Sequence, residues 1–129
     1  MTELRADELQ DHVLIVEDEF LIVVGLSMII EDLGMKVCAT AATADDAVAL
    51  AREFRPSIVL MDMCLRGERD GVDAALAIRA LVGSKIIFLS GSSDAKTMAR
   101  IQLADPKAVL FKPVSDRELM NALETAARY

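Results

Sequence analysis

Short apolar runs alternate with longer amphipathic segments along the whole chain. The apolar runs have the length of β-strands and lie near residues 13–17, 36–39, 57–61, 85–89 and 108–111. Segments with helical spacing of apolar residues lie near residues 19–33, 43–54, 72–82, 94–104 and 115–128. Regular alternation of strand and helix favours βαβ units, in which helices cover both faces of a parallel sheet. The pattern therefore predicts an α/β fold with a five-stranded parallel sheet and five helices.

Several of the predicted strands are followed directly by a charged or polar residue. The run at residues 58–61 is apolar throughout, as expected of a strand buried on both faces, and it leads into Asp62. The other strand ends lead into Glu17-Asp18-Glu19, Ser90 and Lys112. Open α/β sheets bind ligands at the carboxyl ends of their strands, so we expect these side chains to converge.

Acids, a hydroxyl and an amine at one site suit phosphoryl transfer assisted by a cation. A carboxylate can attack a phosphoryl group where a cation offsets the approach of two negative partners, and Mg²⁺ prefers such oxygen ligands. We expect Asp18 and Asp62 to be direct ligands of Mg²⁺, with Glu17 holding a coordinated water. Ser90 and Lys112 would contact phosphoryl oxygens. Taken singly, each residue also fits a solvated loop or a helix cap; together they favour a site with Asp62 as phosphoryl acceptor.

Composition and charge narrow the class of protein. The chain has 129 residues, is 53% hydrophobic and only 4% aromatic, and carries a net charge of −7. This is the size of one domain with an aliphatic core, and nucleic-acid binding would need a basic face instead. The apolar stretch at residues 20–30 is too short to span a bilayer, and the first residues do not resemble a signal peptide. We expect one cytoplasmic domain that binds neither nucleic acid nor membrane.

The strand-end residues resemble, in type and order, the receiver domain of two-component response regulators, in its stand-alone, single-domain form. The residues that carry the resemblance are Glu17-Asp18, Asp62, Ser90 and Lys112-Pro113. The resemblance covers residues 12–128 and implies a doubly wound, flavodoxin-like fold with strand order 2-1-3-4-5. The chain then divides into a polar N-terminal extension, residues 1–11, and a receiver domain, residues 12–129.

The resemblance also implies a role for each of these residues. Asp62 takes a phosphoryl group from a sensor histidine kinase or a histidine phosphotransfer protein, and this switches a surface near residues 94–104 for a downstream protein. Glu17, Asp18, Asp62 and the main-chain carbonyl of Cys64 together assemble the Mg²⁺ site. Ser90 matches the switch hydroxyl and Lys112 the phosphate-binding lysine, whose bond to Pro113 is cis in the family. Such a domain is a signalling module and not an enzyme.

One departure from the family pattern concerns the aromatic residue that commonly stands three positions before the lysine. That position is Val109 here, so switching through an aromatic side chain is not available in its usual form. The nearest aromatic residues are Phe88 and Phe111, and we expect both to pack in the core. The departure leaves open an alternative, a degenerate receiver that binds its partner without being phosphorylated.

A second departure lies in the loop after Asp62. Arg66 stands where a proline is frequent, and we expect Arg66 and Arg69 to be solvated rather than close to the phosphoryl group. A phosphohydrolase with a strand-end aspartate nucleophile is another alternative, but such enzymes need a second acid where Cys64 stands. A nucleotide- or flavin-binding module is disfavoured because no Gly-rich phosphate loop follows the first strand.

The first predicted helix is apolar around most of its circumference. Its expected inward face consists of Ile22, Leu26, Ile29, Ile30 and Leu33. Phe20, Val24 and Met28 form a stripe on roughly the opposite side, which predicts a patch for docking the phosphodonor or for self-association as a homodimer. The alternatives are scattered surface residues, or cover from the N-terminal segment.

Overall fold

The computed structural model describes residues 11–128, in which strands and helices alternate from end to end. The strands are β1 (His12–Val16), β2 (Lys36–Ala41), β3 (Ile58–Asp62), β4 (Lys85–Ser90) and β5 (Ala108–Phe111). The helices are α2 (Phe20–Asp32), α3 (Ala44–Phe54), α4 (Gly71–Leu81), α5 (Ala95–Gln102) and α6 (Asp116–Arg128). The predicted order of elements is confirmed, with ends that differ by a few residues. The predicted N-terminal extension lies, except for Asp11, outside the described residues.

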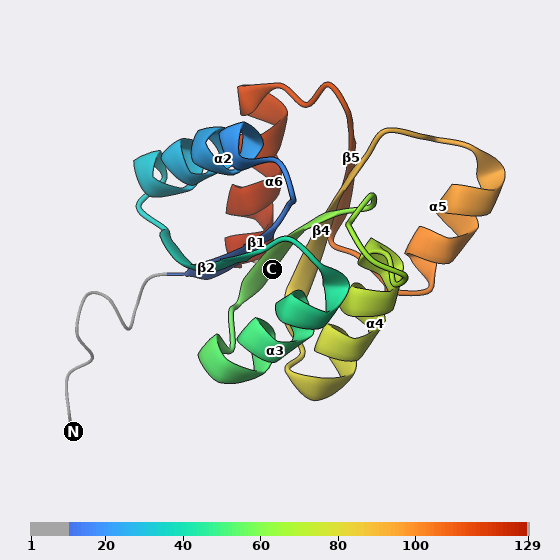
Figure 1. Cartoon of the computed structure of the whole chain (residues 1–129). Coiled ribbons are helices and arrows are strands. Elements are labelled where there is room, and N and C mark those ends of the chain that lie inside the picture. The colour runs from blue at the N-terminus through green and yellow to red at the C-terminus, as the bar shows by residue number, and fades with distance from the viewer. Residues whose placement is uncertain (1–10, 129) are drawn as a thin grey trace.

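The five strands form one parallel sheet with the order β2-β1-β3-β4-β5. Helices α2 and α6 cover one face, and α3, α4 and α5 cover the other (Figure 1). This confirms the doubly wound fold with strand order 2-1-3-4-5. Because all strands are parallel, their carboxyl ends lie along one edge of the sheet, where the predicted site residues follow.

The core consists of two aliphatic layers, one on each face of the sheet. Successive residues of a strand point to opposite faces, so Leu14 and Val16 pack beneath α3 and α4, whereas Val13 and Ile15 pack beneath α2 and α6. The central strand β3 is buried along its whole length, including its last residue, Asp62. A charged side chain is thus held at the end of a fully packed strand.

Two expectations about apolar side chains are wrong. Phe88 is fully buried as predicted, but Phe111 is 42% exposed, because β5 is an edge strand with a neighbour on one side only. In α2, Leu26 and Ile30 are buried as predicted, whereas Ile22 is 37% exposed and lines an open groove beside α6. None of the helices formed by residues 11–128 is long and apolar enough to cross a membrane.

Candidate functional site

Three carboxylates meet where β1 and β3 end. The two strands are neighbours, with Val16 opposite Met61, so Glu17 and Asp18 emerge beside Asp62. One carboxylate oxygen from each of the three acids lies within 4.8 Å of the others. Glu17 is only 4% exposed and Asp62 3% exposed, which is costly for charged groups without compensation. The sheet therefore concentrates negative charge at this edge.

The surroundings of Glu17 disfavour its charged form unless a positive charge lies nearby. Its Oε2 accepts hydrogen bonds from the amides of Asp18 (2.8 Å) and Glu19 (3.2 Å), while its buried Oε1 has no hydrogen-bond partner among the described residues. Burial, opposed by the Glu19 amide and reinforced by the charge of Asp62, raises the pKa of Glu17 to about 7. An unpartnered buried oxygen beside two further carboxylates fits a hard divalent cation such as Mg²⁺.

Lys112 places a positive charge directly beside Asp62. Its Nζ donates a hydrogen bond of 2.8 Å to Asp62 Oδ1, which also accepts one of 3.2 Å from the amide of Cys64. Burial works to lower the pKa of Lys112, but the hydrogen bond to Asp62 and the nearby acids raise it above its usual value. The bond between Lys112 and Pro113 is cis, as expected. The ammonium is thus charged and directed at the acid.

Ser90 ends β4, next to β3, but its hydroxyl is bonded within its own loop. The side chain is 1% exposed; its Oγ donates to the carbonyl of Ser92 at 2.7 Å and accepts from the Ser92 amide at 3.2 Å. The structure therefore brings Ser90 to the same edge of the sheet as Asp62 without a hydrogen bond between them. The expected contact of this hydroxyl with a phosphoryl oxygen requires it to turn.

The loop after β3 carries two arginines that both form ion pairs. Arg66 Nε lies 3.5 Å from Asp18 Oδ2, although the side chain is 74% exposed, and Arg69 Nη1 lies 3.1 Å from Asp45 Oδ1. The expectation of two solvated arginines away from the site is therefore wrong for Arg66. A β-bridge between Arg66 and Thr43 holds the loop beside the start of α3, which carries this guanidinium to the acidic cluster.

Gly71 is a site residue that sequence reasoning did not identify. A Cβ at this position would overlap the main-chain carbonyl oxygen of Asp62 and press on Met61, so only glycine lets the start of α4 pass this closely. The dipeptide Asp70-Gly71 resembles a turn, and the sequence carries no other sign of this contact. The carboxylate of Asp70 in fact caps α4 in a reciprocal capping box with Asp73.

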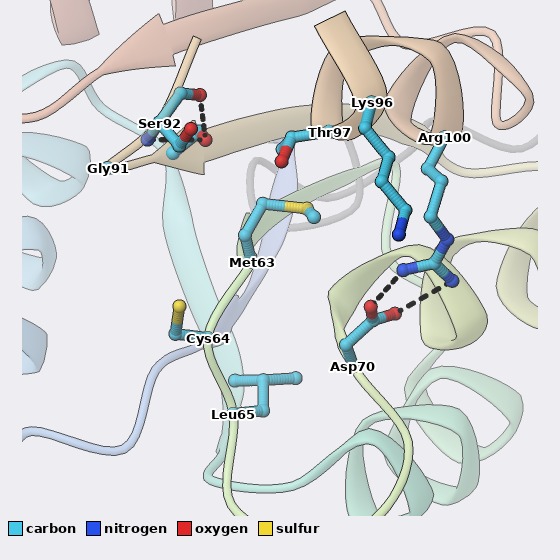
Figure 2. A pocket seen from close by; sticks show the side chains of 10 residues that line it. Met63, Cys64, Leu65, Asp70, Gly91, Ser92, Lys96, Thr97 and Arg100 are labelled. Carbon is cyan, nitrogen blue, oxygen red and sulfur yellow. Dashed lines mark hydrogen bonds and ion pairs between the residues drawn. The ribbon is translucent and has the colours of Figure 1, made fainter. Parts of the chain in front are cut away.

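A cavity of about 750 Å³ opens beside the acidic cluster, between α5 and the loop after β3 (Figure 2). Met63 and Leu65 line it from the loop, and Ser90 and Thr97 line it from the other side. At its rim the guanidinium of Arg100 forms an ion pair with Asp70, and the burial that would raise the pKa of Asp70 is outweighed by this partner, which lowers it. The spacing of these residues in sequence does not reveal this pair.

Comparisons with known proteins agree with this architecture. Residues 13–124 match the response regulator receiver domain family. The transcriptional regulatory protein PdtaR of Mycobacterium tuberculosis is 35% identical over 115 residues, which are 89% of this chain and 56% of that protein. The response regulator UvrY of Escherichia coli (strain K12) is 32% identical over 116 residues, 88% of this chain and 53% of that protein. The chain thus spans about half the length of these curated relatives.

Solved structures give the same result. The signal receiver domain of a modulated diguanylate cyclase from Desulfovibrio desulfuricans G20 is 35% identical and superposes with a TM-score of 0.85, covering 92% of this chain and 94% of that one. A CheY-like receiver domain protein from Methanospirillum hungatei JF-1, 24% identical, has a TM-score of 0.84 over 92% and 94% of the two chains, and it supports the fold alone. The chain belongs to the response regulator receiver domain family of two-component systems.

Proposed function

We propose that the chain is a phosphoacceptor signalling domain in which Asp62 receives a phosphoryl group from a sensor histidine kinase or a histidine phosphotransfer protein. One observation carries the proposal: the buried Asp62 carboxylate accepts a hydrogen bond of 2.8 Å from Lys112 and lies close to the carboxylates of Glu17 and Asp18. An ion pair that only stabilised the fold would not need two further acids beside it, because adjacent carboxylates repel one another. The membership in the receiver family supports the same assignment.

The residues around Asp62 suit an in-line displacement at phosphorus. A carboxylate oxygen of Asp62 forms the new P–O bond while the P–N bond of the donor phosphohistidine breaks, and the imidazole nitrogen keeps that electron pair. Lys112 stabilises charge on the phosphoryl oxygens. Glu17, Asp18, Asp62 and the main-chain carbonyl of Cys64 would hold Mg²⁺, which when bound offsets the repulsion between the acid and the incoming phosphoryl group.

The change of surface that follows would begin at Ser90. Once Asp62 carries a phosphoryl group, an oxygen acceptor stands at the strand ends, and the Ser90 hydroxyl turns from the Ser92 carbonyl to donate to it. We infer that the resulting shift around α5 alters affinity for a downstream protein. This is a local change in charge that biases a two-state element, as expected of a signalling module rather than an enzyme.

We also infer that α2 receives the phosphodonor. Phe20, Val24 and Met28 are 76%, 39% and 62% exposed, and Leu21, which the predicted stripe omitted, is 82% exposed. The stripe begins two residues after Asp18, so a helix lying on it would present a histidine to the acidic cluster. Val24→Glu and Met28→Glu should slow phosphotransfer from the histidine protein. An unchanged transfer rate and oligomeric state in both variants would refute this docking surface, and a changed oligomeric state alone would indicate a homodimer.

The central proposal is tested with a small phosphodonor. Incubation with Mg²⁺ and acetyl phosphate should label the chain, and Asp62→Ala should abolish the label. Glu124→Ala removes an exposed acid of α6 and should leave the label intact, which controls for non-specific phosphorylation of carboxylates. No label and no Mg²⁺ binding would identify a degenerate receiver, and steady turnover of phosphate esters would identify a phosphohydrolase.

A further inference from the structure

A chain of hydrogen bonds links Ser90 to the first turn of α5. Ser90 Oγ donates to the carbonyl of Ser92 at 2.7 Å, and Ser92 Oγ donates to Asp94 Oδ2 at 2.6 Å. Asp94 Oδ1 then accepts from the amide of Thr97 at 2.8 Å and so caps the helix. We propose that Ser92 and Asp94 are positioning residues that couple the orientation of the Ser90 hydroxyl to the N-terminal turn of α5. The proposal rests on the phosphoacceptor function.

The first link is exclusive, because a serine hydroxyl has one proton to donate. In this structure Ser90 gives that proton to the Ser92 carbonyl, and its oxygen accepts the Ser92 amide. When the Ser90 hydroxyl turns toward a phosphoryl oxygen, the Ser92 carbonyl loses its hydrogen-bond donor. The Ser92 amide loses its acceptor in the same movement. The main chain at Ser92 therefore loses the bonds that hold it in place, and it moves or finds new partners.

The second link transmits that displacement to the helix. The hydroxyl of Ser92 is bonded to the carboxylate of Asp94 and also accepts the Asp94 amide at 3.2 Å, so residues 92 and 94 move together. A bond from a hydroxyl to a carboxylate is among the stronger hydrogen bonds. Together with the Thr97 amide it keeps the pKa of Asp94 below its usual value, so the cap stays charged. A shift at Ser92 thus displaces the group that fixes the start of α5.

Helix α5 is held loosely enough to respond. It has eight residues, of which only Ile101 is buried, whereas the eleven-residue helix α4 buries five of its residues. The cavity of about 750 Å³ lies beneath α5 and next to Ser90, so Lys96 and Thr97 of the first turn border open space, and Met98 is the residue of that turn that packs against the core (Figure 2). This route to the surface uses no aromatic side chain at Val109.

The coupling is tested by comparing Ser92→Ala with the matched variant Ser93→Ala. Ser92→Ala keeps the main-chain partners of Ser90 but removes the hydroxyl that reaches Asp94. Ser93 is an exposed neighbour in the same loop and takes no part in the chain of bonds. Amide resonances of each protein are recorded with Mg²⁺, before and after addition of beryllium fluoride as a phosphoryl mimic.

In the parent protein and in Ser93→Ala we expect beryllium fluoride to shift the amides near Asp62, at Ser92 and at Thr97. In Ser92→Ala the amides near Asp62 should still shift, which shows that the site is filled, while Thr97 loses most of its shift. A full shift of Thr97 in Ser92→Ala would overturn the coupling and leave the phosphoacceptor function intact. No shift near Asp62 in the parent protein would overturn the phosphoacceptor function, and the coupling with it.

Discussion

The acidic cluster and helix α5 lie on either side of Ser90, but they are held in place by different kinds of interaction. Glu17 follows β1, in which every residue but His12 is buried, and Asp62 ends the fully buried β3; both acids are less than 5% exposed. Helix α5 depends on one buried side chain, Ile101, and on polar contacts at its two ends. Phosphoryl chemistry requires fixed distances, whereas a signal requires an element that moves at low cost. The proposed function assigns these two requirements to neighbouring regions, a tightly packed acidic cluster and a loosely packed helix.

Ion pairs and hydrogen bonds also join α5 and the turn after it to α4, whose N-cap residue Asp70 lines the same cavity. Near the start of α4, Arg100 pairs with Asp70 and lies 3.5 Å from Asp73. Near its end, Arg79 donates to the carbonyls of Ala104 and Asp105 at 2.9 and 2.7 Å. Partly exposed ion pairs are individually weak and can be exchanged for water. Helix α5 can therefore shift against α4 while α4 stays with the sheet.

The largest effect is expected when the apolar anchor of α5 is removed. Ile101→Ala leaves a cavity and should lower the free energy of unfolding by about 3 kcal/mol. The same change in α4, Ile78→Ala, should cost a similar amount, since both side chains are fully buried. Native-state hydrogen exchange should separate them: faster exchange confined to α5 in Ile101→Ala, and spread over the domain in Ile78→Ala. Equal exchange patterns would contradict the contrast between the two helices.

Gly71→Ala tests how little movement the acidic cluster tolerates. The added methyl group overlaps the carbonyl oxygen of Asp62, so we expect a loss of about 2 kcal/mol in the free energy of unfolding and slower labelling of Asp62 by acetyl phosphate. The control is Gly25→Ala in α2, where no atom beyond the adjoining residues and the helix's own backbone lies within 4 Å of the new Cβ. That change should stabilise the helix by about 1 kcal/mol. Unchanged labelling in Gly71→Ala would show a more adaptable cluster.

Glu17→Gln tests whether burial of Glu17 makes the free energy of unfolding depend on pH. The pKa of Glu17 is about 7 in the folded protein against an ordinary value of 4.5, so between these pH values the folded state binds more protons than the unfolded state. Stability of the parent protein without Mg²⁺ should therefore fall as pH rises through this window. The variant lacks this dependence and should be more stable by on the order of 2 kcal/mol above the window, and no more stable below it. Denaturant unfolding measures both, and parallel pH profiles would contradict the cause assigned to the shift.

The smallest effect is expected from Arg100→Met, which keeps the apolar stem and removes the ion pairs of α5 with Asp70 and Asp73. We expect a loss of about 1 kcal/mol at neutral pH and faster hydrogen exchange in α5. Because Arg100 lowers the pKa of Asp70, this stabilisation exists above the ordinary aspartate pKa and disappears as pH falls through the folded value. Lys96→Met, at the rim of the same cavity, should change neither quantity.

The order of strands and helices, and the residues at the strand ends, were predictable from the sequence alone. An apolar run such as residues 58–61 is recognisable locally, and the parallel arrangement then places Asp62 beside Glu17 and Asp18 without further information. Lys112 follows from the same rule and lies within hydrogen-bond distance of Asp62, while its contact with a phosphoryl oxygen stays a prediction.

Only the tertiary structure decided which contacts these elements make with one another. The approach of Gly71 to Asp62, the pairing of Arg66 with Asp18 and the exposure of Phe111 depend on how loops cross the sheet edge and on which strand lies outermost. The direction of the Ser90 hydroxyl depends on a backbone carbonyl two residues away, in a loop whose path no periodicity predicts. Periodic patterns report the burial of one segment, whereas these contacts arise between segments far apart in the chain or in irregular loops.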